Sequence, residues 1–559
     1  MSVVHRLSAP LWETLCRHTS FYVFILSTLL FVIAHHTGFL NPYIINDDTR
    51  QQIYWMQRWV DPSLYPKDIL NEYAMRYVPW GVQSLYYAAA TIMSPLLFSK
   101  VLTGGLFVLM AMCAFWGGKY MVDEELGLSM VAAYWMIPAF LHSISGGLSR
   151  AFAGPLMLLF ILAWVRRSRW LMAGTLLLQA LFIPYIFILC GVSIGLGMLA
   201  WRLGVASAPP FLAKWQDYVI SVLACCGLLA WRFQMHQAGF GPIASMADMI
   251  GRLEFSEAGR FGIVPVPSIF WELFVRPFEL IAPFHRGGPV VGGLGVAVCV
   301  GLFFFGGQGF PWQRIKSSAD VWLSVGVASI LLYAVARLVL LQLFIPSRYL
   351  EYTMNIVYCC FLGCALVGVY RYFHLKRETF MFGLLIGAFV IGCIRLQGVA
   401  LYDYSTDRPV CEFIRSSTAK DALIAGHPFQ MDDVLTFGQR NVFASYELAH
   451  PWFVGYWKVI RQRLENLFKA YYSSNIDDVV AFCMDNGIDY LVVDKRYFAD
   501  DFIAGGAFFA PFDEEIRAIT SHGDGFAVLH ADLPGTTIQP GVKILDISKL
   551  AANISGSRE

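Results

Sequence analysis

Long apolar stretches separated by short polar segments fill the first 401 residues of the chain. A helix needs about 20 mostly apolar residues to cross a bilayer, and these stretches predict about eleven membrane spans. They lie at about 20–38, 100–118, 127–143, 151–165, 169–184, 186–203, 217–232, 289–309, 320–343, 351–370 and 379–401. We therefore expect an α-helical polytopic membrane domain over residues 1–401.

The residues after position 401 follow a different pattern. Amphipathic helical stretches alternate with short apolar runs bounded by polar residues, which are typical of buried strands. A C-terminal soluble α/β domain is therefore predicted over residues 402–559, long enough for a core of its own. Its predicted helices lie at 409–419, 451–472 and 476–487, the last capped by Asn475, and its predicted strands lie at 421–426, 488–494 and 525–532.

Composition agrees with this division. The chain is 57% hydrophobic and 14% charged, whereas soluble domains contain about 25% charged residues. The basic residues are scattered and the C-terminal region is acidic, which speaks against nucleic-acid binding. Most cysteines lie in or beside apolar spans, where they are expected to fill space between helices. Cys411 and Cys483 lie in the C-terminal region, and the sequence leaves open whether they pair.

Short loops rich in Lys and Arg are typical of the cytoplasmic side of a membrane protein. Three such loops fall on the same side as the N-terminus if the apolar segment 80–98 does not span. We therefore expect this segment to be a helix on the outer membrane surface. The three basic loops are 166–169, 313–316 and 371–378, and the segments expected outside are 40–99, 233–288 and the C-terminal region.

Two adjacent carboxylates, Asp47 and Asp48, follow the first predicted span. Adjacent carboxylates repel each other, and each is costly to desolvate near lipid. They are therefore expected to be held by a cation or a basic partner, or to take a proton from a substrate. One could act as a general base, or hold a divalent cation against a phosphate. The alternative is structural, because a carboxylate just ahead of a helix is a favoured N-cap.

A few basic residues are candidates for binding a phosphate on the outer side. Arg150 and Arg348 are the two arginines of otherwise basic-poor outer loops, and Arg337 lies inside an apolar span. Arginine binds phosphate through two parallel hydrogen bonds. His142 lies near the same face and could assist. The alternatives are snorkelling of the arginines to lipid headgroups and a structural role for the histidine.

The first outer loop carries a family resemblance. Its stretch "NDDTRQQIYWMQRWVDPSLYPKDIL" resembles the "DDxRQ…FWMQR…DPxLFPxD" pattern of uncharacterised bacterial members of the GT-C superfamily of polytopic glycosyltransferases. The order of elements is similar too: a first span, a long outer loop that opens with an acidic pair, and surface helices before the second span. "PSRY", which ends at Tyr349, and "IDYLVVD" are also similar to these proteins.

The resemblance implies an enzyme that takes a sugar from a polyprenyl-phosphate or polyprenyl-diphosphate donor and transfers it, typically with inversion, to a lipid, glycan or protein acceptor. A carboxylate of the first loop, Asp47 or Asp48, would orient or activate the acceptor hydroxyl. The implied donor site would include Arg150, Arg348, Arg337, His142 and Tyr349. Aromatic residues such as Trp55 would stack on the sugar or form an interfacial belt.

The sequence departs from better-known members in two respects. It lacks a "WWD" motif in the C-terminal region, so transfer of an oligosaccharide to asparagine is unsupported. It also lacks a second acidic motif in the other early outer loop, which reads "HSISGGLSR". No residue is therefore assigned as a metal ligand, and Mg²⁺ or Mn²⁺ stays open as a cofactor.

Other functions remain open at this point. A transporter or flippase of lipid-linked sugars would share the arginines and the apolar groove, and a polysaccharide polymerase or ligase would rely more on arginine and histidine. A scaffold that positions other proteins through the C-terminal region is a further alternative. The expected location is a bacterial inner membrane, with the N-terminus cytoplasmic and the C-terminal region extracytoplasmic. The sugar and the acceptor are not indicated by the sequence.

Overall fold

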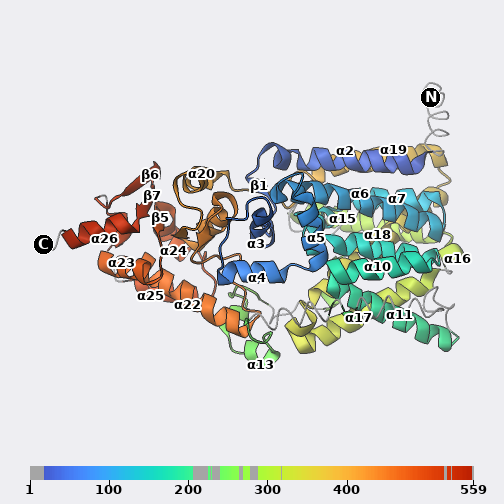
Figure 1. Ribbon diagram of the computed structural model, residues 1–559. Helices are drawn as coiled ribbons and strands as arrows, with labels where there is room; N and C mark the ends of the chain where they lie inside the picture. The colour runs from blue at the N-terminus through green and yellow to red at the C-terminus, as the bar shows by residue number, and fades with distance from the viewer. Residues whose placement is uncertain are drawn as a thin grey trace, which may run out of the picture.

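The computed structural model describes residues 18–204, 225–226, 228, 239–262, 269–276, 288–315, 318–521, 525–530 and 532–556. A bundle of long helices forms one half of the molecule, and the C-terminal region forms the other half (Figure 1). The first outer loop, residues 41–94, lies between the two halves. The chain enters the bundle at the end that is remote from the C-terminal region (Figure 1).

The bundle contains six helices that are long and apolar enough to cross a membrane. A seventh span is present if the bent pair α7 and α8 counts as one. The helices of the bundle are α2 (Thr19–Leu40), α6 (Pro95–Met121), α7 (Glu124–Met136), α8 (Pro138–Ile144), α9 (Ala153–Val165), α10 (Arg169–Phe182), α11 (Pro184–Arg202), α15 (Gly288–Gly309), α17 (Ala319–Val339), α18 (Ser347–Tyr372) and α19 (Arg377–Arg395). The chain is therefore a multi-pass membrane protein, and the number of about eleven spans stays a prediction.

Several predicted spans differ from the helices observed. The predicted span 127–143 is broken between α7 and α8 by 74°, because Pro138 cannot continue the hydrogen-bond ladder of α7. The segments 151–165 and 169–184 form helices of fewer than 18 residues. Most of the predicted span 217–232 lies outside the described residues. The segment 80–98 contains α5 (Trp80–Ala89), whose 10 residues are too few to cross a bilayer.

Small residues bring the helices of the bundle close together. A Cβ atom on Gly118 of α6 would lie 2.6 Å from the backbone nitrogen of Gly127 in α7. A Cβ atom on Gly306 of α15 would lie 2.4 Å from the carbonyl oxygen of Ala365 in α18. Larger side chains would push these helix pairs apart. Such close backbone approach is a common source of van der Waals contact between helices in lipid.

The predicted basic loops meet at the end of the bundle where α2 begins. Arg371 pairs with Asp123 at 3.1 Å, Arg314 pairs with the same carboxylate at 3.3 Å, and Arg377 pairs with Glu125 at 2.7 Å. Arg166 lies over the ring of Tyr120 in the last turn of α6, 4.6 Å from its centroid. Figure 1 shows α16 (Trp312–Ile315) at this end, opposite the C-terminal region.

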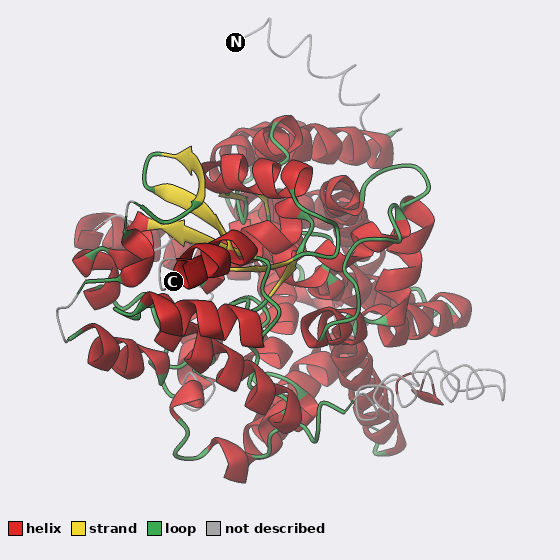
Figure 2. Cartoon of the chain, turned by 60° about the vertical axis from the view of Figure 1, so that its left-hand side comes forward, coloured by secondary structure: helices red, strands yellow, loops and turns green. Residues whose placement is uncertain are grey.

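The C-terminal region has a five-stranded sheet surrounded by helices (Figure 2). The strand order is β4-β3-β5-β7-β6; β3 is parallel to both β4 and β5, and β7 is antiparallel to β5 and β6. The strands are β3 (Leu423–Ala425), β4 (Asn441–Val442), β5 (Tyr490–Asp494), β6 (Gly535–Gln539) and β7 (Val542–Asp546). The helices are α20 (Arg408–Ser417), α21 (Pro428–Asp433), α22 (Val454–Tyr471), α23 (Ile476–Asp485), α24 (Asp500–Ala504), α25 (Phe512–Thr520) and α26 (Ile547–Gly556).

The sequence located three of these helices, α20, α22 and α23, and two of these strands, β3 and β5. Asn475 caps α23 as predicted, because its side chain accepts a hydrogen bond from the backbone N–H of Asp477. The predicted strand 525–532 is wrong: residues Ala527–Leu529 form a single 3-10 turn. The sheet instead gains the hairpin of β6 and β7, whose turn contains Gly541 at a φ of +83°. Cys411 and Cys483 are both buried and both free.

A second, two-stranded sheet ties the first outer loop to the C-terminal region. Strand β1 (Ile44–Ile45) pairs antiparallel with β2 (Tyr402–Asp403). The other helical elements of the loop are α3 (Thr49–Gln52), the 3-10 helix Tyr54–Trp59 and α4 (Ile69–Tyr77). The predicted domain boundary at residue 402 therefore falls at a strand that the first loop completes.

Candidate active site

The acidic pair lies at the junction between the first loop and the bundle. Asp48 occupies the N-cap position of α3, yet its side chain makes no capping hydrogen bond. Its carboxylate instead accepts a short hydrogen bond from the guanidinium of Arg150, which lies 102 residues further along the chain. The N-cap alternative therefore does not account for the Asp48 side chain.

The turn between α8 and the 3-10 helix Ser149–Phe152 brings Arg150 to this position. Gly146 and Gly147 have φ values of +91° and +61°, which glycine adopts without strain. A Cβ atom on Gly146 would lie 2.8 Å from the side-chain oxygen of Asn46. That oxygen accepts a second hydrogen bond from Arg150, at 3.2 Å. The glycine pair thus lets the turn approach the acidic pair closely enough for Arg150 to reach both Asn46 and Asp48.

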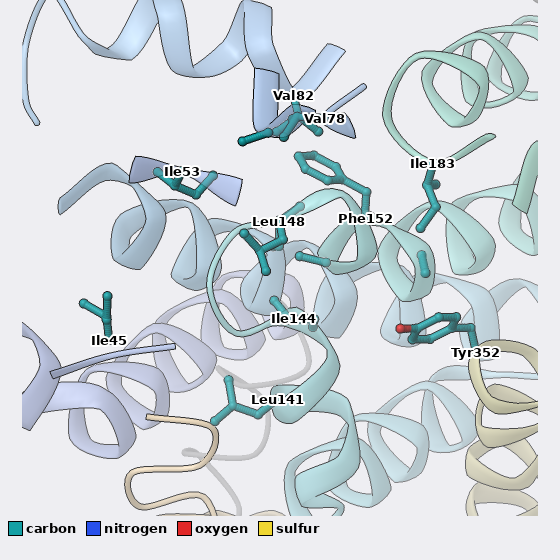
Figure 3. Packing of buried hydrophobic residues seen from close by; sticks show 14 of the residues in the cluster. Ile45, Ile53, Val78, Val82, Leu141, Ile144, Leu148, Phe152, Ile183 and Tyr352 are labelled. Carbon is teal, nitrogen blue, oxygen red and sulfur yellow. The ribbon is translucent and has the colours of Figure 1, made fainter. Parts of the chain in front are cut away.

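Apolar side chains pack the same turn against the first loop. Ile53, Val78 and Val82 of the loop belong to one buried cluster with Leu148 and Phe152 of the turn (Figure 3). All five are at most 7% exposed. Because this packing holds the first loop against the turn, it also fixes the positions of Asp48 and Arg150 relative to each other.

Arg348 adds a second guanidinium to the site. It lies at the start of α18, where it pairs with Glu351 at 3.0 Å and donates to the hydroxyl of Tyr352 at 2.9 Å. Glu351 also pairs with Arg276, at 3.5 Å. Asp48 lies within electrostatic range of Arg348. Three arginines therefore face two carboxylates, which leaves a net positive charge beside the membrane.

Two further side chains border this positive cluster. The charges of Arg150, Glu351, Asp48 and Arg348 all act on the ring of His142, which lies on α8 and is exposed. Tyr77, the last residue of α4, is in range of Asp48, Arg348 and Arg150, and burial raises its pKa. The structure thus brings together four of the residues that the sequence singled out: Asp48, Arg150, Arg348 and His142.

Asp47 points to the other side, toward the C-terminal region. Its carboxylate pairs with Arg50 at 2.5 Å and accepts a hydrogen bond from the hydroxyl of Tyr404 at 2.6 Å. The Arg50 guanidinium lies over the Tyr404 ring, 4.0 Å from its centroid. Burial opposes ionisation of Asp47, but Arg50 and the Tyr404 hydroxyl outweigh it and hold the pKa of Asp47 below its ordinary value.

Arg50 is the centre of a buried charge network. Its side chain is 8% exposed and also pairs with Asp433 at 2.9 Å and Glu447 at 3.7 Å. Glu447 pairs in turn with Arg260 of the second outer loop, at 3.6 Å. Burial raises the pKa of Glu447 to about 8, and burial likewise raises the pKa of Asp433. The network joins the first loop, the second loop and the C-terminal region around Asp47.

Sequence reasoning missed most of this network. Arg50 follows Asp47 by three residues, so the spacing of a helical turn could have indicated their contact. Asp433 and Glu447 lie in acidic stretches that match no motif. Tyr404 lies 357 residues from Asp47, and no local signal connects them.

Three predicted site residues lie elsewhere. Trp55 is 1% exposed and packs edge-on against Trp59. Tyr349 is fully buried, and its hydroxyl donates to the carbonyl of Leu343. Arg337 is exposed near the end of α17, with its guanidinium 6.0 Å from the ring centroid of Tyr333, and no ion pair to it is found among the described residues. Their roles in binding stay predictions.

The described side chains do not fit a divalent cation at this site. Within the described ranges, no three His, Cys, Asp or Glu side chains are grouped so that they could hold a metal ion. Asp48 and Asp47 each face a guanidinium, Arg150 and Arg50 respectively. Guanidinium groups therefore take the place at the acidic pair that a divalent cation would need.

Comparison with known proteins places the fold. No protein-family profile and no curated protein sequence matches the chain. The apo oligosaccharyltransferase of Archaeoglobus fulgidus is similar in structure, with a TM-score of 0.52 and 13% identity over 92% of this chain and 75% of that one. AglB from the same organism, in complex with an inhibitory peptide and a dolichol-phosphate, has a TM-score of 0.51 and 12% identity over 90% and 72%.

ArnT from Cupriavidus metallidurans bound to undecaprenyl phosphate is also similar. Its TM-score is 0.51 and its identity 10%, over 96% of this chain and 98% of that one. AglB and ArnT are membrane glycosyltransferases of the GT-C superfamily. The chain therefore has the GT-C fold, with a sheet-containing C-terminal region, as the sequence predicted.

Proposed function

We propose that the protein is a membrane glycosyltransferase that moves a sugar from a polyprenyl-phosphate or polyprenyl-diphosphate donor to an acceptor hydroxyl. The observation that carries the proposal is the pairing of Asp48 with Arg150, next to Arg348, at the end of an apolar bundle. The GT-C fold supports it, and two similar structures contain a dolichol-phosphate or undecaprenyl phosphate.

The donor fits the membrane side of the site. Its prenyl chain has to stay among apolar helices, so its phosphate has to lie where the bundle ends. Arg150 and Arg348 present guanidinium groups at that level, and Arg276 leaves the cluster with a net positive charge. Guanidinium groups bind phosphate through two hydrogen bonds at once. These arginines would stabilise the charge that grows on the leaving phosphate.

Asp48 is the general base in this proposal. A donor phosphate competes with Asp48 for Arg150, and its binding frees the carboxylate. Asp48 then takes the proton of the acceptor hydroxyl while that oxygen bonds to the anomeric carbon. The bond between the anomeric carbon and the phosphate oxygen breaks, and its electron pair leaves with the polyprenyl phosphate.

Asp47 has a different role in the proposal. Arg50 and Tyr404 hold its carboxylate on the side that faces away from Arg348. A carboxylate paired in this way is a poor base, because its pKa lies below the ordinary value. Asp47 therefore positions the backbone on which Asp48 stands.

The side of the membrane follows from the loops. The three basic loops lie at the end of the bundle where α2 begins, and the candidate site lies at the opposite end (Figure 1). Basic short loops face the cytoplasm, so the transfer is assigned to the extracytoplasmic side, in a bacterial inner membrane. The acceptor reached from there is a lipid, a glycan or a protein.

A carrier of lipid-linked sugars is the second candidate. The break between α7 and α8 favours it, because transporters often place broken helices at their binding sites. In this chain, however, the break leads directly into the turn that delivers Arg150 to Asp48. A carrier would need the positive cluster but no proton acceptor beside it.

The test is consumption of polyprenyl-phosphate sugars by purified protein in lipid. Asp48→Asn is expected to lower turnover by about 10²–10⁴, the usual contribution of a general base, and Asp47→Asn to lower it by roughly tenfold or less. Asp61→Asn is the matched control, because Asp61 is an exposed carboxylate of the same loop that pairs with Lys420. Equal turnover by wild type and Asp48→Asn would rule out Asp48 as the base, and binding of the donor without consumption would favour the carrier.

A further inference from the structure

A second group of side chains suited to a ligand lies on the side of the acidic pair that faces the C-terminal region. The donor takes the membrane side of the site under the proposed function, so the acceptor has to approach from the other side. The second outer loop and the C-terminal region meet there. The backbone N–H of Ala244 donates to the carbonyl of Trp452 at 2.8 Å, and that of Ala510 donates to Ala258 at 2.8 Å. These two bonds fix the loop next to Trp452.

Charged and aromatic side chains face each other across this junction. Arg260 pairs with Glu447 at 3.6 Å, and their side chains are 27% and 12% exposed. Phe261 packs against Trp452 with ring centroids 5.1 Å apart, and Tyr77 packs against the same indole at 5.4 Å. Phe261 and Tyr77 are partly exposed. Arg260 is close enough to Asp47 to act on its charge, so the group adjoins the acidic pair.

Two donors of this group have no acceptor. The Nε1–H of Trp452 and the Nε–H of Arg260 are buried and make no hydrogen bond to any described residue. Buried donors are normally paired, so an orphaned donor calls for an explanation. Two orphaned donors on neighbouring side chains, one from each of two segments, indicate a ligand that supplies oxygen atoms.

We propose that Arg260, Phe261, Glu447 and Trp452, together with Tyr77, form the acceptor subsite and that it binds the pyranose ring of a glycan acceptor. The inference rests on the proposed function for its placement of the donor. It selects one of the three acceptor classes that the proposed function leaves open.

The chemistry of a pyranose matches the group. Neighbouring ring hydroxyls can hydrogen-bond to the carboxyl group of Glu447 and accept from the guanidinium of Arg260. A further ring oxygen accepts from the indole N–H of Trp452. The apolar C–H face of the sugar packs against the partly exposed rings of Phe261 and Tyr77. An acyl chain would leave Arg260 and Glu447 without such partners, and a peptide backbone would present no apolar ring face to Phe261 and Tyr77. Trp55, which the sequence suggested for stacking, is buried in the first loop.

The test is direct sugar binding by the full-length protein in lipid nanodiscs. Saturation-transfer NMR is measured with millimolar methyl glucopyranoside, methyl galactopyranoside and methyl mannopyranoside, on wild type and two matched variants. Trp452→Phe keeps an aromatic ring but removes the unpaired N–H. Trp457→Phe removes an indole N–H that is already paired, to Glu254 at 3.0 Å. We expect wild type and Trp457→Phe to give saturation transfer to at least one pyranoside, and Trp452→Phe to lose it at least fivefold.

Three outcomes would overturn the inference. They are no saturation transfer from wild type to any of the pyranosides, equal transfer to wild type and Trp452→Phe, or equal losses in both variants. Donor consumption by the wild-type protein is measured in parallel. Donor consumption without pyranoside binding would contradict the glycan subsite but support the proposed glycosyltransferase activity. Pyranoside binding that Trp452→Phe abolishes, without consumption of any donor, would support the subsite but contradict the proposed reaction.

Discussion

Replacing Tyr404 by phenylalanine tests how the C-terminal region holds Asp47. The phenol donates a 2.6 Å hydrogen bond to the Asp47 carboxylate, and its ring lies under the Arg50 guanidinium. Phenylalanine keeps the ring and removes only the hydroxyl. A hydrogen bond to a charged group contributes about 1.5–3 kcal/mol. The Asp47 side chain is 41% exposed, so solvent screening lowers the expected loss to about 1 kcal/mol.

The loss should depend on pH, and its sign follows from Asp47. Burial raises the pKa of Asp47, but Arg50 and Tyr404 lower it further, so the net value lies below that of an unfolded chain. A carboxylate with a lowered pKa contributes stability above its unfolded pKa, and this stability is lost as the pH falls through the folded value. The hydrogen bond from Tyr404 belongs to the charged form. The cost of Tyr404→Phe is therefore full at pH 7 and decreases as the pH falls through the lowered, folded-state pKa of Asp47.

The assay is the apparent melting temperature in detergent over a series of pH values from 7 down to acid pH, with Tyr472→Phe as the control. The Tyr472 hydroxyl donates to the carbonyl oxygen of Tyr497 at 3.0 Å, a neutral acceptor that does not titrate. A loss of about 1 kcal/mol lowers the melting temperature of a domain of about 150–250 residues, the size of the C-terminal region, by about 2–4 °C. Tyr472→Phe should show this at every pH, whereas the cost of Tyr404→Phe should decrease as the pH falls. A cost of Tyr404→Phe that follows the same pH dependence as that of Tyr472→Phe would refute the assigned contact.

Two further predictions concern the turn and the charge network. Gly147→Ala should lower both thermal stability and donor turnover, because its Cβ would lie 2.8 Å from the carbonyl oxygen of Ser99 and its φ is +61°. The control Gly105→Ala, which has open space around it, should leave the melting temperature unchanged and change turnover by no more than about twofold. Unchanged melting temperature and turnover in Gly147→Ala would contradict the close approach. Burial raises the pKa of Glu447 to about 8, so the stability it contributes is full below its unfolded pKa and is lost as the pH rises through about 8. Glu447→Gln should flatten the decline of the melting temperature between pH 6 and pH 9, and an unchanged decline would contradict this origin.

The sequence located the parts of the site that follow local rules. Apolar length predicted the membrane helices, and the acidic pair drew attention to the first loop. Arg150 and Arg348 stood out because their loops contain few other basic residues; in the structure Arg150 contacts Asp48, and Arg348 lies within electrostatic range of it. Pro138 marks a break that the apolar pattern alone concealed.

The rest depends on contacts between distant segments. The difference between Asp47 and Asp48 arises because one faces Arg50 and Tyr404 while the other faces Arg150. Adjacent residues of the same type carry no sequence signal for such a division. Trp55 is a further example: an aromatic residue in this loop suggests a binding surface, and the tertiary packing that buries it has no local signal in the sequence.

Strand β1 can pair with β2 only after residues 402–403 have been synthesised, so the first loop reaches its final structure late in synthesis. Asp47 leaves the ribosome early, whereas Tyr404 follows 357 residues later. At a synthesis rate of about 5–20 residues per second, the first loop waits roughly 20–70 s for its partner. During that interval the loop lacks the strand and the buried acids that hold Arg50. A chain interrupted before residue 402 therefore inserts helices into the membrane but lacks Tyr404 and Asp433, which hold Asp47 and Arg50.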